Sequence, residues 1–429
     1  MSLLVTVLAA IGFFALIMAS IALHEIGHLL PAKLFGVKVT QYFVGFGKNL
    51  WRTRRGETEY GIKLLPLGGY VRLVGMYPPR RAGSTATPGL LARLADEARD
   101  VEYEDISPAD EGRLFHQKPV WQKVIVMAGG PLMNLLLAFV ILGGINGIHG
   151  QYRTQLVADQ VSECVVPVTR SDRTCREGDP AAPSRVAGIQ PGDRILAFNG
   201  VQTQSWDQLS DMIRANGAGP AQLVVERDGQ QITLPSTHTI VTGMRGRLDP
   251  SKTVEAGFLG VTPRAELERG GLVVTAQDLW LQTRRSVTAL ATFPVKVWNV
   301  ATDLATGQQR DANGPISIIG ASRAAGEIAG THQLTTGDKI ASWFGMLASV
   351  NLFVCLLNCI PLPPLDGGHI AGALYEGLKR GGARLLGRPD PGHVDTARML
   401  PVAYGVGGFL AVAGAVLILA DLISPIKLF

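Results

Sequence analysis

Four long runs of apolar residues divide the chain into membrane-length and polar stretches. They cover roughly Leu3–Leu23, Val124–Ile148, Ile340–Leu365 and Pro401–Ile426, and Asp421 in the last run is the single charged residue within them. Each run is close to or longer than the ~20 residues that an α-helix needs to cross a bilayer. The pattern predicts a polytopic α-helical membrane protein with four transmembrane helices.

A signal peptide is the alternative explanation of the first run. Such a peptide carries basic residues before its apolar core. No Lys or Arg precedes Lys33 in this sequence, which favours a first transmembrane helix.

Basic residues in the loops predict the orientation of these helices. Lys33, Lys38, Lys118 and Lys123 lie near the ends of the first long loop, and further Lys and Arg residues follow between 379 and 398. Because cytoplasmic loops carry the excess of Lys and Arg, both loops are expected inside, and both termini and the long middle segment outside. The expected transmembrane helices lie at 1–33, 120–150, 339–369 and 400–429. The first two are joined by a cytoplasmic loop at 34–119, which contains a membrane-associated β-hairpin region and a flexible insertion, and the last two by a cytoplasmic loop at 370–399. Between the second and third helices we expect a β-rich domain at 151–240 and an extracytoplasmic linker with an amphipathic helix at 241–338.

Composition agrees with a membrane protein and excludes other classes. Charged residues are only 17% of the chain and hydrophobic residues 47%, whereas soluble domains carry about 25% charged residues. The net charge of +5 is modest for 429 residues, and basic loops account for it. We therefore expect no nucleic-acid partner and no ordinary soluble enzyme.

The middle segment contains a compact α/β pattern. Turn signals at Pro191-Gly192 and Asn199-Gly200 flank an apolar strand at 195–198, a helix is expected at 207–215, and Asp228-Gly229 predicts a hairpin between strands at 221–227 and 231–235. The run from Ala187 to Leu196 makes this region resemble a PDZ domain of the bacterial protease type, and another small β-domain is the alternative. Residues 279–300 mix apolar and basic side chains and predict an amphipathic helix on the outer membrane surface; a plain connecting helix is the alternative.

Two features of the loops leave their structure open. Cys164 and Cys175 lie in the segment expected outside, where a disulfide persists, and their spacing permits a bridge without requiring one. The cytoplasmic stretch from Tyr77 to Gly112 is rich in Pro, Ser and Thr and then acidic, which predicts a flexible or partly helical insertion.

The end of the first helix carries a metal-binding pattern. It reads His24-Glu25-Ile-Gly-His28, and residues four apart share one face of a helix. Two imidazoles at this spacing reach one cation with a carboxylate beside them, as in zinc peptidases. Ionisable residues inside an apolar helix are costly and indicate a functional site; hydrogen bonding between helices is the alternative.

A catalytic zinc site needs a third protein ligand. Asp366 is the acid at the end of the third apolar run. Because the first and third helices run in the same direction, Asp366 and His24 reach a similar depth near the cytoplasmic side. His369 is the competing candidate, beyond Gly367-Gly368.

At this point the sequence resembles the site-2 protease family of intramembrane zinc metalloproteases. It is most similar to the bacterial group that contains the regulator of sigma-E protease, in particular its actinobacterial members, although it has one PDZ-like region where that regulator has two. The matching segments are His24-Glu25-x-x-His28, Gly68-Gly69-Tyr70-Val71, Phe115-x-x-Lys118-Pro119-x-Trp121, Gly130-Pro131-x-x-Asn134, Gly314-Pro315-Ile316 and Leu365-Asp366-Gly367.

The expected chemistry assigns Zn²⁺ to His24, His28 and Asp366 and makes Glu25 the general base and acid. An extended substrate is expected to pair with a strand edge from a hairpin of residues 58–65 and 70–74, joined through Pro66, Gly68 and Gly69; a purely structural hairpin is the alternative. Asn134 is a further candidate for holding substrate backbone, and the resemblance adds Asn358, Gly68, Gly69 and Tyr70. Hydrogen bonding between helices is the alternative for both asparagines.

The resemblance also implies partners and a location. The substrates would be single-span membrane proteins, such as anti-sigma factors and remnant signal peptides, trimmed first by an upstream site-1-type protease. The protein would lie in the bacterial cell membrane with its active site toward the cytoplasm. A membrane-anchored binding module and a transporter are the rival readings; the intact Glu25 disfavours the first, and the absence of paired halves disfavours the second.

Overall fold

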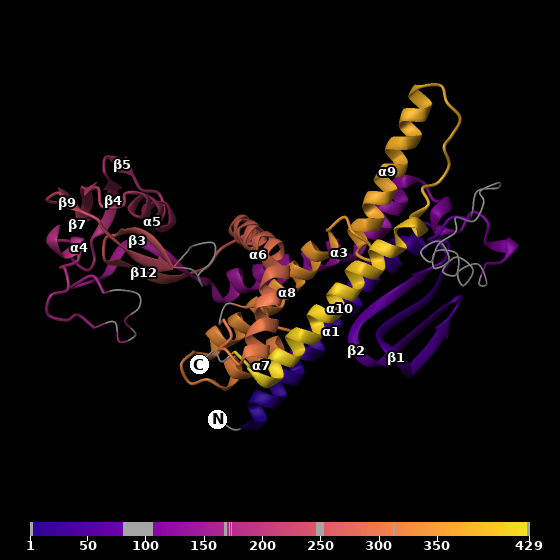
Figure 1. Ribbon diagram of the computed structural model, residues 1–429, viewed down its shortest axis with the longest axis horizontal. Helices are drawn as coiled ribbons and strands as arrows, with labels where there is room; N and C mark the ends of the chain where they lie inside the picture. The colour runs from indigo at the N-terminus through magenta and orange to yellow at the C-terminus, as the bar shows by residue number, and fades with distance from the viewer. Residues whose placement is uncertain are drawn as a thin grey trace. The chain divides into compact units, whose positions relative to one another are not determined.

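The computed structural model describes residues 3–79, 106–166, 170, 172, 174–245, 253–311 and 314–426. It divides into two compact units, one formed by Met1–Ile145 with Leu272–Phe429 and the other by Asn146–Gly271. Figure 1 shows the elements of both. Most of the insertion expected at 77–112 lies outside the described residues.

The first unit is built on long apolar helices. In the part of the chain that the structure describes, four helices are long and apolar enough to cross a membrane: α1 (Leu3–Leu34), α3 (Val120–Gly144, continued by a π-helical turn at Ile145–His149), α8 (Thr336–Asn358) and α10 (Leu400–Ile423). The prediction of four membrane-length helices is confirmed. Their side chains shield a backbone that is hydrogen-bonded internally, as the lipid interior requires.

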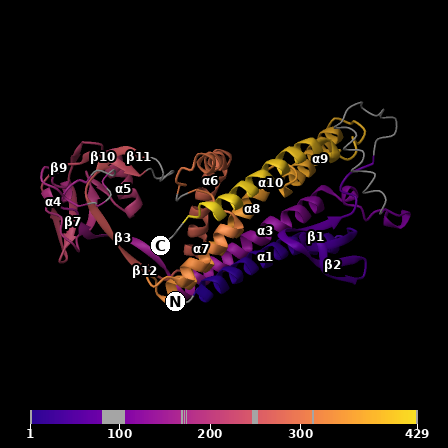
Figure 2. The same cartoon turned by 60° about the horizontal axis from the view of Figure 1, so that its bottom comes forward.

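Three further helices complete this unit, α6 (Leu272–Thr306), α7 (Ile318–Gly330) and α9 (Asp366–Leu385). Figure 2 shows α1, α3 and α8 running along one another. Phe13 and Ile17 of α1 pack against Ala325 of α7 and Leu347 of α8, and Val297 of α6 packs against α10. The helix expected at 279–300 is therefore present and extends further at both ends. Short 3-10 turns lie at Pro108–Asp110, Phe115–Gln117 and Thr396–Met399.

The third membrane segment differs from the expected single helix over 339–369. Helix α8 ends at Asn358, and α9 begins only at Asp366. Proline residues between them lack the N–H that a helix interior needs, and the connecting loop folds back onto the first turn of α9. A Cβ on Gly367 would lie 2.3 Å from the carbonyl oxygen of Ile360, so this turn accepts glycine alone. Asp366 thus starts a helix, and much of the stretch expected as a loop at 370–399 is helical.

A twisted antiparallel ladder lies against α1. Its two long strands are β1 (Val39–Arg55) and β2 (Thr58–Leu73). Residues 41–44 of β1 pair with residues 59–62 of β2 on one side and with residues 69–72 on the other. The expected hairpin between 58–65 and 70–74 is therefore wrong, because β1 lies between these two segments. Gly45 and Gly47, both at positive φ, let β1 bend so that its later part pairs with 58–63.

The second unit is mostly a sheet with the strand order β12-β3-β4-β7-β8, in which β5 also pairs with β4. The bounds are β3 Gln151–Val161, β4 Arg194–Phe198, β5 Val201–Gln202, β7 Leu223–Arg227, β8 Gln230–Thr233 and β12 Val261–Glu268, with short pairs β6 (Pro220–Ala221) with β9 (Thr237–His238) and β10 (Ile240–Arg245) with β11 (Thr253–Phe258), and helices α4 (Pro183–Val186) and α5 (Trp206–Ala215).

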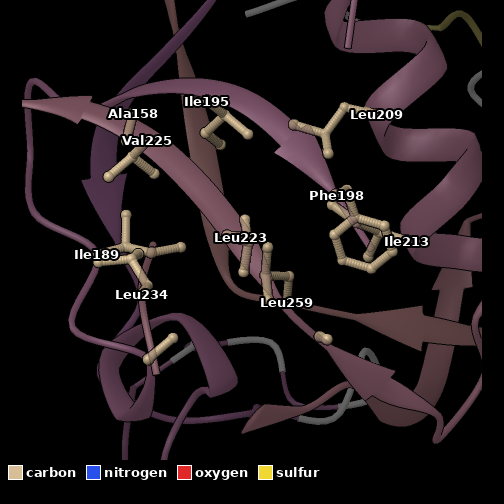
Figure 3. Packing of buried hydrophobic residues seen from close by; sticks show 12 residues of the cluster. Ala158, Ile189, Ile195, Phe198, Leu209, Ile213, Leu223, Val225, Leu234 and Leu259 are labelled. Carbon is tan, nitrogen blue, oxygen red and sulfur yellow. The ribbon is translucent and has the colours of Figure 1, made fainter. Parts of the chain in front are cut away.

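The core of this unit confirms the expected strands and helix. Leu209 and Ile213 of α5 face Phe198 of β4, with Ile195 and Leu223 beside them in the sheet (Figure 3). The hairpin at Asp228-Gly229 is also confirmed, since both residues have the positive φ that this tight turn needs.

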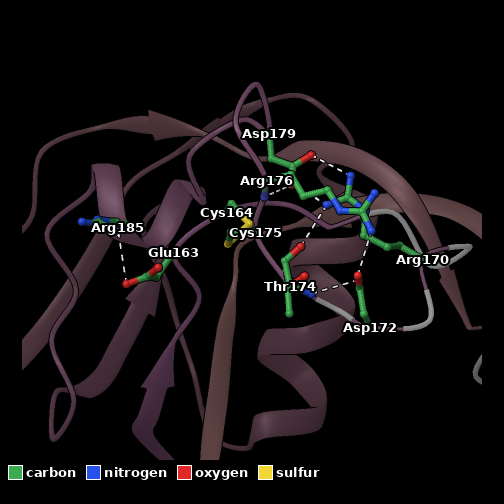
Figure 4. The surroundings of a disulfide bond; sticks show 9 residues. All are labelled: Glu163, Cys164, Arg170, Asp172, Thr174, Cys175, Arg176, Asp179 and Arg185. Carbon is green, nitrogen blue, oxygen red and sulfur yellow. Dashed lines mark hydrogen bonds and ion pairs between the residues drawn. A yellow bond between two sulfur atoms is a disulfide. The ribbon is translucent and has the colours of Figure 1, made fainter.

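The sequence left the pairing of two cysteines open, and the structure joins them. Cys164 and Cys175 form a disulfide across 11 residues, and Figure 4 shows the ion pairs around it. Arg170 donates to Asp179 at 2.5 and 2.9 Å. The hydrogen bonds from Arg170 hold the pKa of Asp179 at about 2, below its usual range.

Candidate metal centre

Two buried imidazoles lie on one face of α1, one turn before its basic end. His24, Glu25 and His28 are each less than a tenth exposed, within a helix that is otherwise almost entirely apolar. The 3.6-residue period of the helix brings His24 and His28 to the same side. Their Nε2 atoms are 3.3 Å apart.

Asp366 completes a triangle of ligand atoms. Its Oδ2 atom lies 3.4 Å from Nε2 of His24 and 3.4 Å from Nε2 of His28. Tetrahedral zinc with bonds of about 2.0–2.1 Å to nitrogen and 2.0–2.2 Å to oxygen separates its ligands by roughly 3.3–3.5 Å. The three distances therefore match the edges of such a site. Among the His, Cys, Asp and Glu side chains that the structure describes, His24, His28 and Asp366 form the group whose ligand atoms are close enough to bind one metal ion.

The hydrogen bonds around the triangle also favour a cation. Nδ1 of His28 lies 2.8 Å from the carbonyl oxygen of Val126. Because a carbonyl only accepts, Nδ1 carries the proton and Nε2 turns its lone pair toward the triangle. Oδ2 of Asp366 is buried and has no hydrogen-bond partner among the described residues. Lone pairs that face one another in a buried site are unfavourable unless a positive ion lies between them.

Glycine residues on α3 make room for the two imidazoles. A Cβ on Gly130 would lie 2.2 Å from Nε2 of His28 and 2.7 Å from Nε2 of His24. One residue earlier, a Cβ on Gly129 would lie 1.9 Å from the carbonyl oxygen of Gly27 on α1. The backbones of α1 and α3 thus meet at this crossing, as small residues allow between membrane helices.

Glu25 lies beside the ligands and is held by the β-ladder. The backbone N–H of Val71 in β2 donates to its carboxylate. A Cβ on Gly69 would come within 2.9 Å of Cγ of Glu25, so glycine is what lets this strand approach the carboxylate. The side chain is therefore fixed next to the triangle, and it is not one of the three atoms that form it.

One cavity of about 460 Å³ brings the candidate residues together. All of the predicted site residues line it: His24, Glu25, His28, Gly68, Gly69, Tyr70, Asn134, Asn358 and Asp366. His369 also lines this cavity, without joining the group of ligand atoms.

Two residues near the metal triangle, one in the cavity wall and one on α3, were not predicted from the sequence as parts of the site. Asn351 lines the cavity and donates to Oγ of Ser20 at 3.1 Å, and a polar residue in an apolar run was the available signal. The sequence pointed to Gly130 only as part of a segment that resembles the family. The pair Gly129-Gly130 in a membrane helix is, however, also typical of a close contact between helices. The Oδ1 atoms of Asn134 and Asn351 have no partner among the described residues.

Aromatic side chains fix the ladder beside the cavity. The Tyr42 hydroxyl donates to the carbonyl oxygen of Ala22 on α1 at 2.9 Å, and burial raises the pKa of Tyr42 to about 12. The hydroxyl therefore stays protonated and keeps donating. Tyr70 stacks on Phe43, with ring centroids 5.8 Å apart, and its hydroxyl accepts from Lys63 at 2.7 Å.

Comparison with known proteins agrees with this geometry. Residues 12–384 match the model of peptidase family M50. The chain belongs to this family, the site-2 proteases. Its similarity to the zinc metalloprotease Rip1 of Mycobacterium tuberculosis is 34% identity over 98% of both chains. It is 29% identical to the metalloprotease MmpA of Caulobacter vibrioides over 84% of both, and 27% identical to the zinc metalloprotease RasP of Shouchella clausii over 87% of this chain and 91% of RasP.

Membership settles the class of the protein. It is a multi-pass membrane protein and a zinc metalloprotease, and its metal is Zn²⁺. Relatives of this kind imply regulated intramembrane proteolysis, in which membrane-bound substrates are generally cut after an upstream protease has acted.

Proposed function

We propose that the chain hydrolyses peptide bonds inside the transmembrane segments of single-span membrane proteins that another protease has already trimmed. The observation that carries this proposal is the position of the metal triangle. Its ligands, Glu25 and an apolar-walled cavity lie between helices that are long and apolar enough to span a membrane. A site at that position meets peptide bonds that are themselves within the bilayer.

In this proposal His24, His28 and Asp366 hold Zn²⁺, which when bound acidifies a water and polarises the scissile carbonyl. The carboxylate of Glu25 takes a proton from the attacking water and delivers it to the departing amide nitrogen. Its fixed position supports this role, because a general base must lie within hydrogen-bond reach of the proton it takes. The N–H of Val71 orients the carboxylate and does not itself take part in the proton transfer.

A substrate helix hides its carbonyls in its own hydrogen bonds and must become extended before it is cut. Residues 69–72 pair with β1 on one side only, and in the described chain no other strand pairs with their outer edge. This edge lines the cavity beside Glu25. An unwound substrate segment adds to it as one more strand, and the amides of Asn134 and Asn358 supply further hydrogen bonds to its backbone.

The orientation follows the basic residues. Lys33 lies in the last turn of α1, Lys123 in the first turn of α3, and Arg380 and Arg384 in α9. With the basic ends inside, the metal site lies toward the cytoplasmic face, and both termini and the PDZ-like region at 151–240 lie outside. That region would select or exclude ectodomain ends. The substrates proposed are anti-sigma factors and remnant signal peptides, and an upstream site-1-type protease makes the first cut.

Helix α6 fits an interfacial role at the outer surface of the bilayer. Trp280 and Trp298 are 67% and 70% exposed, and Arg284 and Arg285 lie between them. Tryptophan and arginine are favoured where membrane and water meet. The lipid bilayer is thus a partner of this helix as well as of the spanning ones.

The test compares wild-type protein with Glu25→Gln in detergent. A single-span substrate is incubated with each, and bound zinc is measured in parallel. We expect Glu25→Gln to keep its zinc and to lose cleavage by at least 100-fold, because general acid–base catalysis contributes about 10²–10⁴ to the rate. Glu266→Gln, an exposed change on β12, is the matched control and is expected to cleave at the wild-type rate.

Three outcomes would contradict parts of the proposal. Cleavage by Glu25→Gln at the wild-type rate would remove Glu25 from the mechanism. Zinc binding without any cleavage by wild-type protein, across trimmed single-span substrates, would favour a membrane-anchored binding module. Unchanged zinc content in Asp366→Ala would reassign the third ligand.

A further inference from the structure

A second buried cluster of charges lies in the first unit, apart from the metal triangle. Nζ of Lys123 on α3 donates to both carboxylate oxygens of Glu376 on α9, at 2.9 and 3.0 Å. The two side chains are only 5% and 4% exposed. Burying two charges is costly unless their geometry and further hydrogen bonds are good. Such a pair calls for an explanation beyond surface solubility.

Glu376 collects partners from three parts of the chain. Besides Lys123, it accepts from Nδ1 of His393 at 3.2 Å, from the backbone N–H of Val394 at 3.1 Å and from Arg380 at 3.4 Å. Burial by itself would raise the pKa of Glu376, but the hydrogen bonds from His393, Lys123 and Val394 lower it to about 2. The carboxylate therefore stays ionised at neutral pH and joins α3, α9 and the segment before α10.

The same stretch of α3 also contacts α1, the helix that carries His24 and His28. Val126, three residues after Lys123, accepts the hydrogen bond from Nδ1 of His28. The glycine crossing at Gly129 and Gly130 follows within the next turn. Helix α3 contributes none of the three ligand atoms. Within two turns it nevertheless contacts both elements that do contribute them.

Glu376 acts on Asp366 through a rigid helix. Asp366 is the first residue of α9, and Glu376 follows ten residues later in the same helix, about 15 Å away along its axis. Next to Glu376, Gly377 packs against Val120 of α3, where an added Cβ would lie 3.2 Å from that side chain. A helix held at such a point cannot slide or rotate without breaking a directional set of hydrogen bonds.

We propose that the Lys123–Glu376 ion pair is a positioning device that sets Asp366 opposite His24 and His28. This inference rests on the proposed zinc ligands. Lys123 and Glu376 are not in the group of ligand atoms and do not line the cavity. An apolar pair of similar volume would give comparable packing, but it would not define one rotation and one height of α9 relative to α3.

The experiment measures the metal site directly in full-length protein purified in detergent. Zinc affinity is determined by competition with a chelator, and the ligand-field absorption of Co²⁺-loaded protein reports the coordination geometry. For Glu376→Gln and Lys123→Met we expect zinc affinity to fall by about 10-fold or more, the loss typical when a supporting partner of a ligand is removed. The Co²⁺ spectrum should change as well. Lys123→Arg keeps the charge and should restore both.

Another buried ion pair supplies the matched control. Arg310 and Asp421 are 4% and 3% exposed and lie 2.5 Å apart, with Asp421 on α10. Asp421→Asn breaks a pair of equal burial, so it should cost comparable thermal stability. It should leave zinc affinity and the Co²⁺ spectrum as in the wild type.

Other results of these experiments would overturn the positioning role of the ion pair. Wild-type zinc affinity and spectrum in Glu376→Gln and Lys123→Met would overturn the proposal. The double variant Lys123→Met/Glu376→Met removes the cost of a lone buried charge. If it binds zinc like the wild type, or if all three variants fail to fold, the pair serves the fold and not the site. Failure of the zinc ligands themselves is seen separately, as unchanged zinc affinity in His24→Ala or Asp366→Ala.

Discussion

The change Gly130→Ala adds a single methyl group to α3 and places it against both imidazoles of the proposed zinc site. The new Cβ would lie 2.2 Å from Nε2 of His28 and 2.7 Å from Nε2 of His24. Non-bonded heavy atoms prefer about 3.5 Å or more, so the His28 ring must retreat by roughly 1 Å. A retreat of the α3 backbone would instead open the close contact between Gly129 and Gly27 of α1.

The magnitude follows from the cost of that overlap. Extra methyl groups in tightly packed sites typically cost about 1–3 kcal/mol. Without metal the rings relieve the overlap by rotating away, whereas metal binding requires them to return. The cost therefore falls on binding and corresponds to about 5- to 150-fold weaker zinc affinity. Misplacement by about 1 Å lowers turnover by a further factor of about 10².

The assay is zinc affinity by chelator competition, followed by cleavage of a single-span substrate at saturating zinc. Gly144→Ala is the matched control, because it adds the same atom to the same helix with nothing within 4 Å. It should bind zinc and cleave like the wild type. Wild-type zinc affinity in Gly130→Ala would refute the reasoning, since the imidazoles would then not occupy the positions described.

Three further predictions concern other parts of the chain. Replacing Cys164 and Cys175 by serine should lower stability by about 2–4 kcal/mol; a reducing agent should lower the thermal midpoint of the wild type but leave that of the variant unchanged. The hydrogen bonds from Lys38 and Ser107 hold the pKa of Asp110 at about 2, below its unfolded value, so its stabilisation is present above about pH 4 and is lost as the pH falls toward 2. Asp110→Asn should therefore flatten the dependence of the thermal midpoint on pH over that interval, and an unchanged profile would disprove the assignment. Asn358→Ala should raise KM about 2- to 13-fold at unchanged zinc content, the worth of one neutral hydrogen bond; an unaltered KM would mean that this amide does not hold substrate.

The sequence by itself determined the membrane helices and predicted the three ligands of the proposed metal site. Apolar runs of bilayer length have one stable solution in lipid, since every backbone polar group must be paired within the helix. His24 and His28 were predictable for a similar reason, because the helical period alone brings residues four apart to one face. Asp366 followed from chain direction, which fixes the depth reached by each helix.

The tertiary structure decided whatever depends on contacts between distant segments. Residues 41–44 lie between 59–62 and 69–72, and local patterning does not specify which strands become neighbours when the sequence supplies several of similar character. The break between Asn358 and Asp366 depends on a loop that folds back onto Gly367. The need for glycine at Gly130 appears only where α1 and α3 cross, since a methyl group is excluded by neighbouring atoms and not by the residue's own helix.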